Sequence, residues 1–455
     1  MNLRLRSDIV DKKFIKTVSI LALPVAMQCM LQSSFCMIDQ MMIGQLGSSS
    51  ITAVGVAGKF SSIYTVIVNS VAAVAGIMIA QYIGAKKEKE SFRSFFLNSM
   101  VASIVSLLFM MVSIIFSENI IGIYTDDILA VDEGAIYLTI ISLSFIPTAI
   151  STVTATWLRS NERAYIPLIT SIIAVVCNTG LNYILIFGKF GVGAMGAKGA
   201  AYATLASQII NMILMVASFI FFAKKDSKRI DFGIKLEKMT AFQYLMILFP
   251  ILINEFLWSL GENVYAYIYG HLDDLSFAAM TLTNPIQGLI MGALSGLSAA
   301  AGIIVGKLLG KKEYDNAYKD SKRLMVMGLV GSVALSLILV MLSELYVSIY
   351  NVEDYVKETA TMLLFVFALY APVKVSNMIV GAGILRSGGN TKIVMIIDII
   401  GTWIFGVPLG FFAAYYLNQS IVGVYLILSF EEVIRLIISI IIFRQKKWMY
   451  GKIQV

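Results

Sequence analysis

Two glutamates, Glu255 and Glu262, lie seven residues apart within the apolar stretch ILINEFLWSLGENVY. In an α-helix this spacing places both side chains on one face, about 10 Å apart along the axis. Two carboxylates on one face can bind a proton or a small cation in turn. Such groups are costly to bury, so we expect these two to take part in ion binding.

Four further acids, Asp39, Asp398, Glu431 and Glu432, also lie inside apolar segments. A carboxylate at the centre of a membrane helix costs about 2.5–3.5 kcal/mol on insertion scales. Each therefore needs a partner, a water-filled cavity or a bound proton. Arg435 follows the two adjacent glutamates by three and four residues, and this spacing allows an ion pair with either.

Asp39 has polar neighbours on its own helix. Gln28 and Gln32 precede it by eleven and seven residues, spacings that return close to the same helical face. The sequence therefore predicts a second polar site around Asp39, separate from the one that contains Glu255.

The segments that position these acids are apolar and long. The 455-residue chain is 58% hydrophobic and 14% charged, whereas soluble domains average about 25% charged residues. About 20 apolar residues suffice for a membrane helix. Twelve segments meet this length: 14–46, 51–83, 92–117, 128–157, 164–188, 193–223, 240–269, 276–309, 318–343, 356–386, 391–417 and 420–444.

The positive charge of the chain is distributed asymmetrically. Alternate loops and the termini hold 28 of the 35 Lys and Arg residues, whereas the intervening loops hold three. This is the positive-inside pattern. It predicts a multi-pass protein of the plasma (inner) membrane with both termini in the cytoplasm. The net charge of +7 then reflects this distribution and not a nucleic-acid partner, and any attraction to anionic lipid headgroups is a by-product.

The sequence repeats itself at an offset of 226 residues. Pro24 matches Pro250, Gly44 matches Gly270, and the segment 75–77 matches 301–303; later, 158–160 matches 385–387 at an offset of 227. Each half holds six predicted helices, so both halves have the same orientation in the membrane. We predict an all-α membrane protein of twelve transmembrane helices in two six-helix parallel repeats around a central cavity. The predicted lobes are 1–223 and 240–455, joined by a cytoplasmic linker at 224–239.

Two similar bundles that rock about a shared cavity can expose it to one side of the membrane at a time. This architecture favours a transporter, although duplication alone could also build a scaffold. An enzyme is not expected, because the chain has one histidine, His271, and lacks HExxH, GxSxG, P-loop and CxxC motifs. Without an ATP-binding motif, active transport must be driven by an ion gradient, and no cofactor is expected beyond that ion.

Several segments together resemble one known family. They are Gln28 to Gly55 with its Asp39, the run NTGLNY at 178–183 followed by GAKGAAYAT at 196–204, LRSGGNTK at 385–392, and GVPLG at 406–410. Their order and spacing are similar to those of the MATE (multidrug and toxic compound extrusion) transporters of bacteria, and the helix 7 pattern is closer to the NorM-like branch. The resemblance covers nearly the whole chain.

The resemblance implies export of bulky, often cationic drugs and dyes in exchange for Na⁺ or H⁺. By position, Glu255 matches the helix 7 glutamate of NorM-like and eukaryotic members, Asp39 the helix 1 aspartate, and Asn178 a helix 5 asparagine. One departure matters: DinF-like members often have aspartate where this chain has Asn182. Asn390 likewise stands where many relatives have aspartate, a loss for which Asp398 could compensate.

We therefore hypothesise that Glu255 is the main coupling carboxylate. A proton needs only the carboxylate, whereas Na⁺ needs several hard oxygen ligands, which Glu255 and the amide oxygen of Asn254 could begin to supply. Either ion would cancel the negative charge and release a cationic substrate. The ion-coupling set that we predict is Glu255, Asp39, Asp398, Glu262, Asn178 and Asn182.

Aromatic faces attract organic cations, and methionines adapt to varied shapes. On this basis, and with polar residues that can contact a substrate, we predict a substrate cavity lined by Gln28, Gln32, Asn254, Trp258, Tyr265, Met280, Asn284, Gln287 and Met291. We also expect a monomer. Two alternatives remain open: a lipid-linked oligosaccharide flippase, whose cavity we expect to be cationic, and a non-transporting receptor or scaffold.

Overall fold

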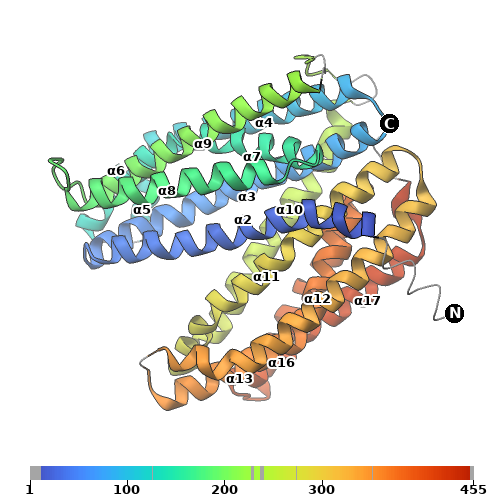
Figure 1. Cartoon of the computed structure of the whole chain (residues 1–455). Helices are drawn as coiled ribbons and strands as arrows, with labels where there is room; N and C mark the ends of the chain where they lie inside the picture. The colour runs from blue at the N-terminus through green and yellow to red at the C-terminus, as the bar shows by residue number, and fades with distance from the viewer. Residues whose placement is uncertain are drawn as a thin grey trace. The chain divides into compact units, whose positions relative to one another are not determined.

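The computed structural model describes residues 12–124, 127–226, 230–235, 240–272, 274–350 and 352–450, except for the side chains of 35–37, 48, 49 and 274. All regular elements in this part of the chain are helices (Figure 1). Ten helical spans in it are long and apolar enough to cross a membrane, and an eleventh results if one bent pair counts as a single span. The all-α membrane prediction is confirmed.

The chain forms two compact units, which we call the N-terminal unit (Leu31–Glu237) and the C-terminal unit (Met1–Met30 with Lys238–Val455). The boundary between the units falls within α2. The lobes predicted from the repeat, 1–223 and 240–455, stay a prediction. The helices of the N-terminal half are α2 (Lys12–Gly44), α3 (Ser48–Gly84), α4 (Glu88–Ile115), α5 (Ser117–Gly122), α6 (Ile128–Ser142), α7 (Phe145–Ser160), α8 (Tyr165–Phe187) and α9 (Ala197–Lys225).

The C-terminal half begins with α10, whose first turn is closed by a capping box in which Thr240 and Gln243 each satisfy the other's backbone N–H. Three of its later segments, η1 to η3, are π-helical, and η4 is a 3₁₀ turn. The elements are α10 (Ala241–Gly270), α11 (Asp274–Gly310), α12 (Tyr314–Ser348), α13 (Asp354–Asn377), η1 (Met378–Leu385), α14 (Thr391–Ile399), η2 (Ile400–Gly406), α15 (Val407–Phe411), η3 (Phe412–Tyr416), α16 (Ile421–Leu428), α17 (Phe430–Arg444) and η4 (Lys447–Met449).

Two predicted spans are not single straight helices. The fourth, 128–157, is divided into α6 and α7, which meet at 44°. Pro147 lies in the first turn of α7, where it has no N–H to donate to the preceding turn, and this favours a break there. The twelfth, 420–444, consists of the eight-residue α16 and the fifteen-residue α17, each too short to cross a bilayer alone.

The helix boundaries reproduce the sequence repeat. The end of α2, both ends of α3 and the starts of α4 and α6 recur 226 residues later in α10, α11, α12 and α13. The turns after α3 and α11 are also alike, because Lys86 and Lys312 both adopt a left-handed conformation, with φ of 58° and 63°. The two-repeat prediction is thus supported at the level of single residues.

One extra residue separates the repeats further along the chain. The starts of α6 and α13 are 226 residues apart, whereas the matching Leu-Arg-Ser segments at the ends of α7 and η1 are 227 apart. The one-residue difference therefore lies between these two points of each repeat. A π-helical turn holds one residue more than the α-helical turn it replaces, so η1 can accommodate the extra residue of the second repeat.

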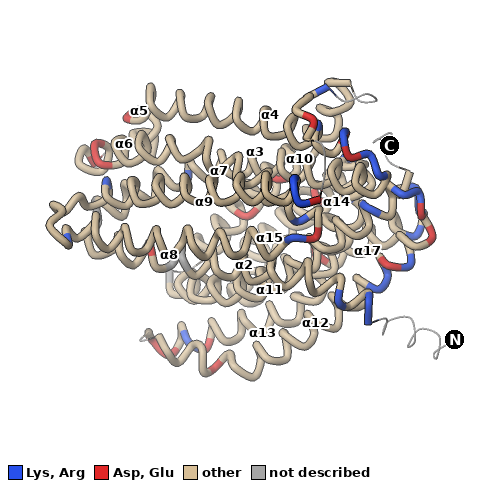
Figure 2. Tube along the Cα trace, turned by 45° about the horizontal axis from the view of Figure 1, so that its top comes forward, with Lys and Arg blue, Asp and Glu red and all other residues tan. Residues whose placement is uncertain are grey.

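Charged residues lie mainly at the helix ends. In Figure 2 the middle parts of the helices are almost entirely tan, and blue and red gather near the connections. At one such end of the N-terminal unit, the linker segment 230–235 contacts α4. The Gly233 N–H and the nearby Arg93 guanidinium hold the pKa of Asp231 below its usual range. Phe232 packs on Phe96 with 4.9 Å between the ring centroids.

Close packing of α8 and α9 depends on a glycine. A Cβ atom added to Gly199 would lie 2.7 Å from the carbonyl carbon and oxygen of Leu185, whereas a Cβ at Gly180, in the middle of α8, would meet nothing within 4 Å. Gly199 therefore lets the two helices approach at backbone distance, and Gly180 has no such role.

We predict that Gly199→Ala destabilises the protein by about 1–3 kcal/mol, because backbone atoms cannot move aside for the methyl group. Gly180→Ala is the matched control and should be neutral or stabilising by up to about 1 kcal/mol, since alanine favours a helix. Thermal unfolding in detergent, followed by tryptophan fluorescence, measures both. Equal midpoints for Gly199→Ala and the wild type would contradict the packing argument.

Candidate functional site

A cavity of about 1000 Å³ lies within the N-terminal unit, between side chains of α2, α3, α6, α8 and α9. Among the described residues that line it, Asp39 is the one carboxylate and Lys59 the one cation. The remaining wall combines apolar groups with uncharged hydrogen-bonding groups, among them Gln32, Gln40, Tyr137, Thr204, Ser207 and Gln208. This volume suits a drug-sized molecule.

Asp39 is held by asparagines of α8. Its Oδ1 accepts a hydrogen bond of 2.8 Å from Nδ2 of Asn182, which also donates to Oδ1 of Asn178 over 3.1 Å. If the Asn178 amide is turned by half a rotation, its nitrogen lies 3.2 Å from Asp39 Oδ1 and its oxygen 3.3 Å from the backbone nitrogen of Thr204. The structure therefore brings together three residues predicted from distant parts of the sequence.

One oxygen of this cluster has no hydrogen-bond donor. Asn182 is 1% exposed, and its Oδ1 is buried without a partner. Buried polar atoms of this kind are uncommon in folded proteins. Together with the carboxylate of Asp39 it is a hard oxygen atom suited to a small cation. The described residues contain no group of three or more His, Cys, Asp or Glu side chains that could hold a metal ion.

A second cavity, of about 200 Å³, lies within the C-terminal unit. It brings together five residues predicted from the sequence: Glu262, Tyr265, Met280, Asn284 and Gln287. It also holds residues that we did not predict for a substrate or coupling site, namely Lys374, Tyr425, Glu431 and Glu432. Tyr425 donates a hydrogen bond of 3.2 Å to Oε1 of Gln287, which fixes one side of the wall.

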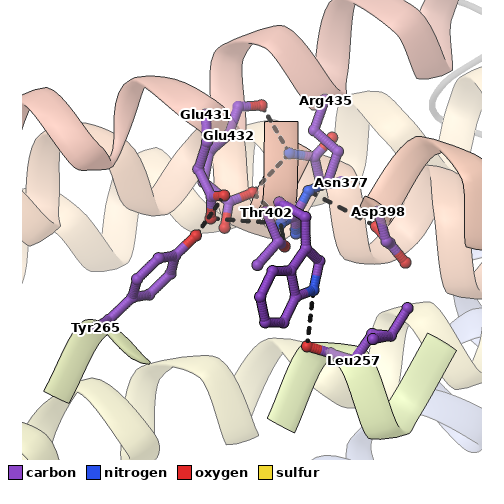
Figure 3. A network of polar contacts seen from close by, with 9 residues as sticks. Leu257, Tyr265, Asn377, Asp398, Thr402, Glu431, Glu432 and Arg435 are labelled. Atoms are coloured by element: carbon purple, nitrogen blue, oxygen red, sulfur yellow. Dashed lines mark hydrogen bonds and ion pairs between the residues drawn. The ribbon is translucent and has the colours of Figure 1, made fainter. Parts of the chain in front are cut away.

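Behind this cavity a buried arginine joins three carboxylates (Figure 3). The Arg435 guanidinium lies 3.3 Å from Glu431, 3.7 Å from Glu432 and 3.6 Å from Asp398. It also donates a hydrogen bond of 2.8 Å to Thr402 in η2. The ion pairs expected from the helical spacing are confirmed, and Asp398 is an additional partner that the spacing could not show.

The glutamates of this network have further donors. Tyr265 donates to Oε2 of Glu431 over 2.6 Å, and Asn377 donates to Oε2 of Glu432 over 2.8 Å. Figure 3 shows both side chains pointing at the carboxylates from separate helices. With these contacts the buried charges are compensated by hydrogen bonds as well as by the arginine, which such a network requires in order to be tolerated.

Glycines of η2 make room for the network. A Cβ atom at Gly401 would lie 2.7 Å from Nε of Arg435. At Gly406 it would collide with the hydroxyl of Tyr265 and with Oε2 of Glu431. The polar groups of α10 and α17 therefore pack directly against the backbone of the span formed by α14, η2, α15 and η3.

Glu255 has a different environment from the one expected. Its Oε1 accepts two hydrogen bonds of 3.2 Å from the guanidinium of Arg386, and it lines neither cavity. The adjacent Asn254 is buried and interacts with Asp398, while its own Oδ1 has no partner. Glu255 and Glu262 share a helix, but the first is in an ion pair and only the second faces the cavity.

The other predicted wall residues are dispersed. Gln32 lines the larger cavity, whereas Gln28 is buried and lines neither. Trp258 is 49% exposed on the surface of its unit, and Met291 packs against the apolar core of the C-terminal unit. The sequence places Lys374 inside an apolar segment. Its proximity to Glu262 could not be predicted, because the two residues lie on different helices.

Comparison with known proteins places the chain in a family. The sequence profile of the MatE family matches residues 24–184 and 250–412, one segment in each half. The uncharacterized transporter YisQ of Bacillus subtilis is 22% identical over 98% of both chains. The probable multidrug resistance protein NorM of Thermotoga maritima is 24% identical over 94% of this chain and 92% of its own length.

Solved structures share the fold. The Vibrio cholerae MATE transporter VcmN, in a mutant form, has a TM-score of 0.86 at 15% identity over 98% of this chain and all of its own. A transporter of the MOP superfamily from Pyrococcus furiosus has a TM-score of 0.84 at 16% identity over 96% and 97% of the two chains. Because the family profile covers both halves and the fold agrees along nearly the whole length, the chain belongs to the MatE family of membrane transporters, which are not enzymes.

Proposed function

We propose that this protein is a secondary antiporter that exports bulky, often cationic organic compounds in exchange for Na⁺ or H⁺. One observation carries the proposal: the single carboxylate among the described lining residues of the larger cavity, Asp39, is held by Asn182 beside an unpartnered oxygen. The name of the Thermotoga relative, a probable multidrug resistance protein, agrees with such a cargo.

The exchange follows from competition for one negative charge. With Asp39 ionised, the cavity attracts an organic cation, whose apolar parts contact the aliphatic and aromatic wall. A proton or Na⁺ bound at Asp39 removes that attraction, and the cation leaves. Rocking of the two repeats, which opens the cavity to one side at a time, would make the exchange vectorial and would use the inward ion gradient.

The charge of the wall also bears on the alternative cargo. The related Pyrococcus transporter is described as having a binding pocket of reverse polarity that suggests a different function, so the fold alone does not determine the substrate. A flippase for lipid-linked oligosaccharides needs cations for the pyrophosphate, whereas Lys59 is the one cation among the described residues around the larger cavity. The balance favours cationic drugs and dyes.

We propose that the protein lies in the plasma (inner) membrane with both termini in the cytoplasm, on the basis of the 28 basic residues in alternate loops and termini. The monomeric state stays a prediction. A C-terminal fusion to alkaline phosphatase, which is active only outside the cytoplasm, should therefore be inactive. An active fusion would reverse the assigned orientation.

Glu255 remains a second coupling candidate in the C-terminal unit. In the conformation described here its charge is balanced by Arg386. An ion could replace that guanidinium only if the pair separates during the cycle, when the unpartnered Oδ1 of Asn254 could add a ligand for Na⁺. Coupling would then begin at Asp39 and involve Glu255 in another state.

We predict that Asp39→Asn lowers gradient-driven ethidium export from proteoliposomes about ten- to a hundredfold, since a contact with a charged group is worth about 1.5–3 kcal/mol. Asp39→Glu should keep part of the activity. The matched control is Asp127→Asn, because Asp127 caps α6 on the surface and lines neither cavity. A Na⁺ gradient and a pH gradient, imposed separately, identify the coupling ion. Unchanged export by Asp39→Asn would exclude its assigned role.

A second prediction concerns Glu255. Glu255→Gln should reduce gradient-driven export severalfold while the protein stays folded, because the side chain is one third exposed. The exchange of both partners, Glu255→Arg with Arg386→Glu, should keep the ion pair and the stability of the protein but abolish transport if the carboxylate at position 255 binds an ion. Full gradient-driven export by Glu255→Gln would refute a coupling role and leave the pair as a structural contact.

A further inference from the structure

The smaller cavity contains a cation that the proposed transport cycle does not use. Lys374 of α13 lines the cavity opposite carboxylates from two other helices, Glu262 of α10 and the adjacent Glu431 and Glu432 of α17. The charges of all three glutamates act on its ammonium group. Lys374 is therefore set among acids from elements that are distant in the sequence.

The arginine of the neighbouring network cannot balance these acids alone. Arg435 contacts Asp398, Glu431 and Glu432, three carboxylates for one guanidinium. Glu262 adds a fourth carboxylate and has no ion pair among the described residues. Unbalanced carboxylates within membrane helices are costly, and a further positive charge near the cavity lowers that cost.

Lys374 can supply that charge without forming an ion pair with any single acid. Within the described part of the chain, Lys374 forms no ion pair with any carboxylate. The other polar groups that face the cavity, including Tyr265, Tyr269, Tyr425 and Gln287, are neutral. The ammonium group is thus shared by several carboxylates across a space wide enough for water.

We propose that the ammonium group of Lys374 is the built-in counter-cation of the smaller cavity and takes the electrostatic place that Na⁺ or another small cation would otherwise fill. A free cation entering the cavity would meet a positive charge already in position. The smaller cavity therefore does not bind Na⁺ in the wild type, because a residue of the chain itself already supplies the positive charge.

The test is Na⁺ binding by the purified full-length protein in detergent, measured with radioactive Na⁺ against choline. All variants carry Asp39→Asn and Glu255→Gln, so that both proposed coupling sites are removed and failure of either coupling role does not affect the result. This background alone should show no saturable Na⁺ binding. Adding Lys374→Met, which removes the charge of a side chain of similar length, should create saturable binding, whereas adding Lys374→Arg should not.

Two results would overturn the proposal: saturable Na⁺ binding by the background that carries Asp39→Asn and Glu255→Gln, or none by the folded variant that also carries Lys374→Met. If Lys374→Met prevents folding, a compensating variant decides. Removing one acid by Glu262→Gln should then restore the yield of monodisperse protein, because the charge is balanced again. Failure of Glu262→Gln to restore it would show that Lys374 acts by packing and would equally refute the proposal.

Discussion

The structure depends on the cost of keeping charge inside apolar helices. Water cannot compensate a buried ion there, so each charged side chain needs partners from neighbouring helices. Arg435 is the clearest case, because it joins α17 to Asp398 of α14 and to Thr402 of η2. The residues of η2 beside these groups are glycines, because the side chain of a larger residue would collide with the polar groups. The packing of the C-terminal unit is in this sense arranged around one guanidinium.

The same constraint has different solutions in the two units. Among its described lining residues the larger cavity has one carboxylate, which accepts a hydrogen bond from a neutral amide. We propose that a mobile ion cancels this charge. The smaller cavity has several carboxylates with cations already close by. As far as the described lining residues show, two repeats that share helix boundaries thus differ in how open their charges are to ions from solution.

Most of the fold could be predicted from the sequence, whereas the sites could be predicted only in part. Long apolar segments and the repeat determined the helices, because these signals lie along the chain. Asp39, Asn178 and Asn182 were identified together, and the structure joins them. The pairing of Glu255 with Arg386 was not foreseen, since contacts between helices leave no mark in the spacing of either one. The bend after Ser142 was not predicted either, because the hydropathy of the sequence is continuous across it.

The π-helical turn η1 has a consequence for the evolution of the second repeat. One inserted residue in a regular α-helix would rotate all later side chains by about 100°, and Arg386 would then point away from Glu255. A wider turn confines the change to a few residues, so the helix beyond it keeps its original faces. A one-residue difference that would ordinarily disrupt a membrane span is thereby compatible with the same side-chain faces in both repeats.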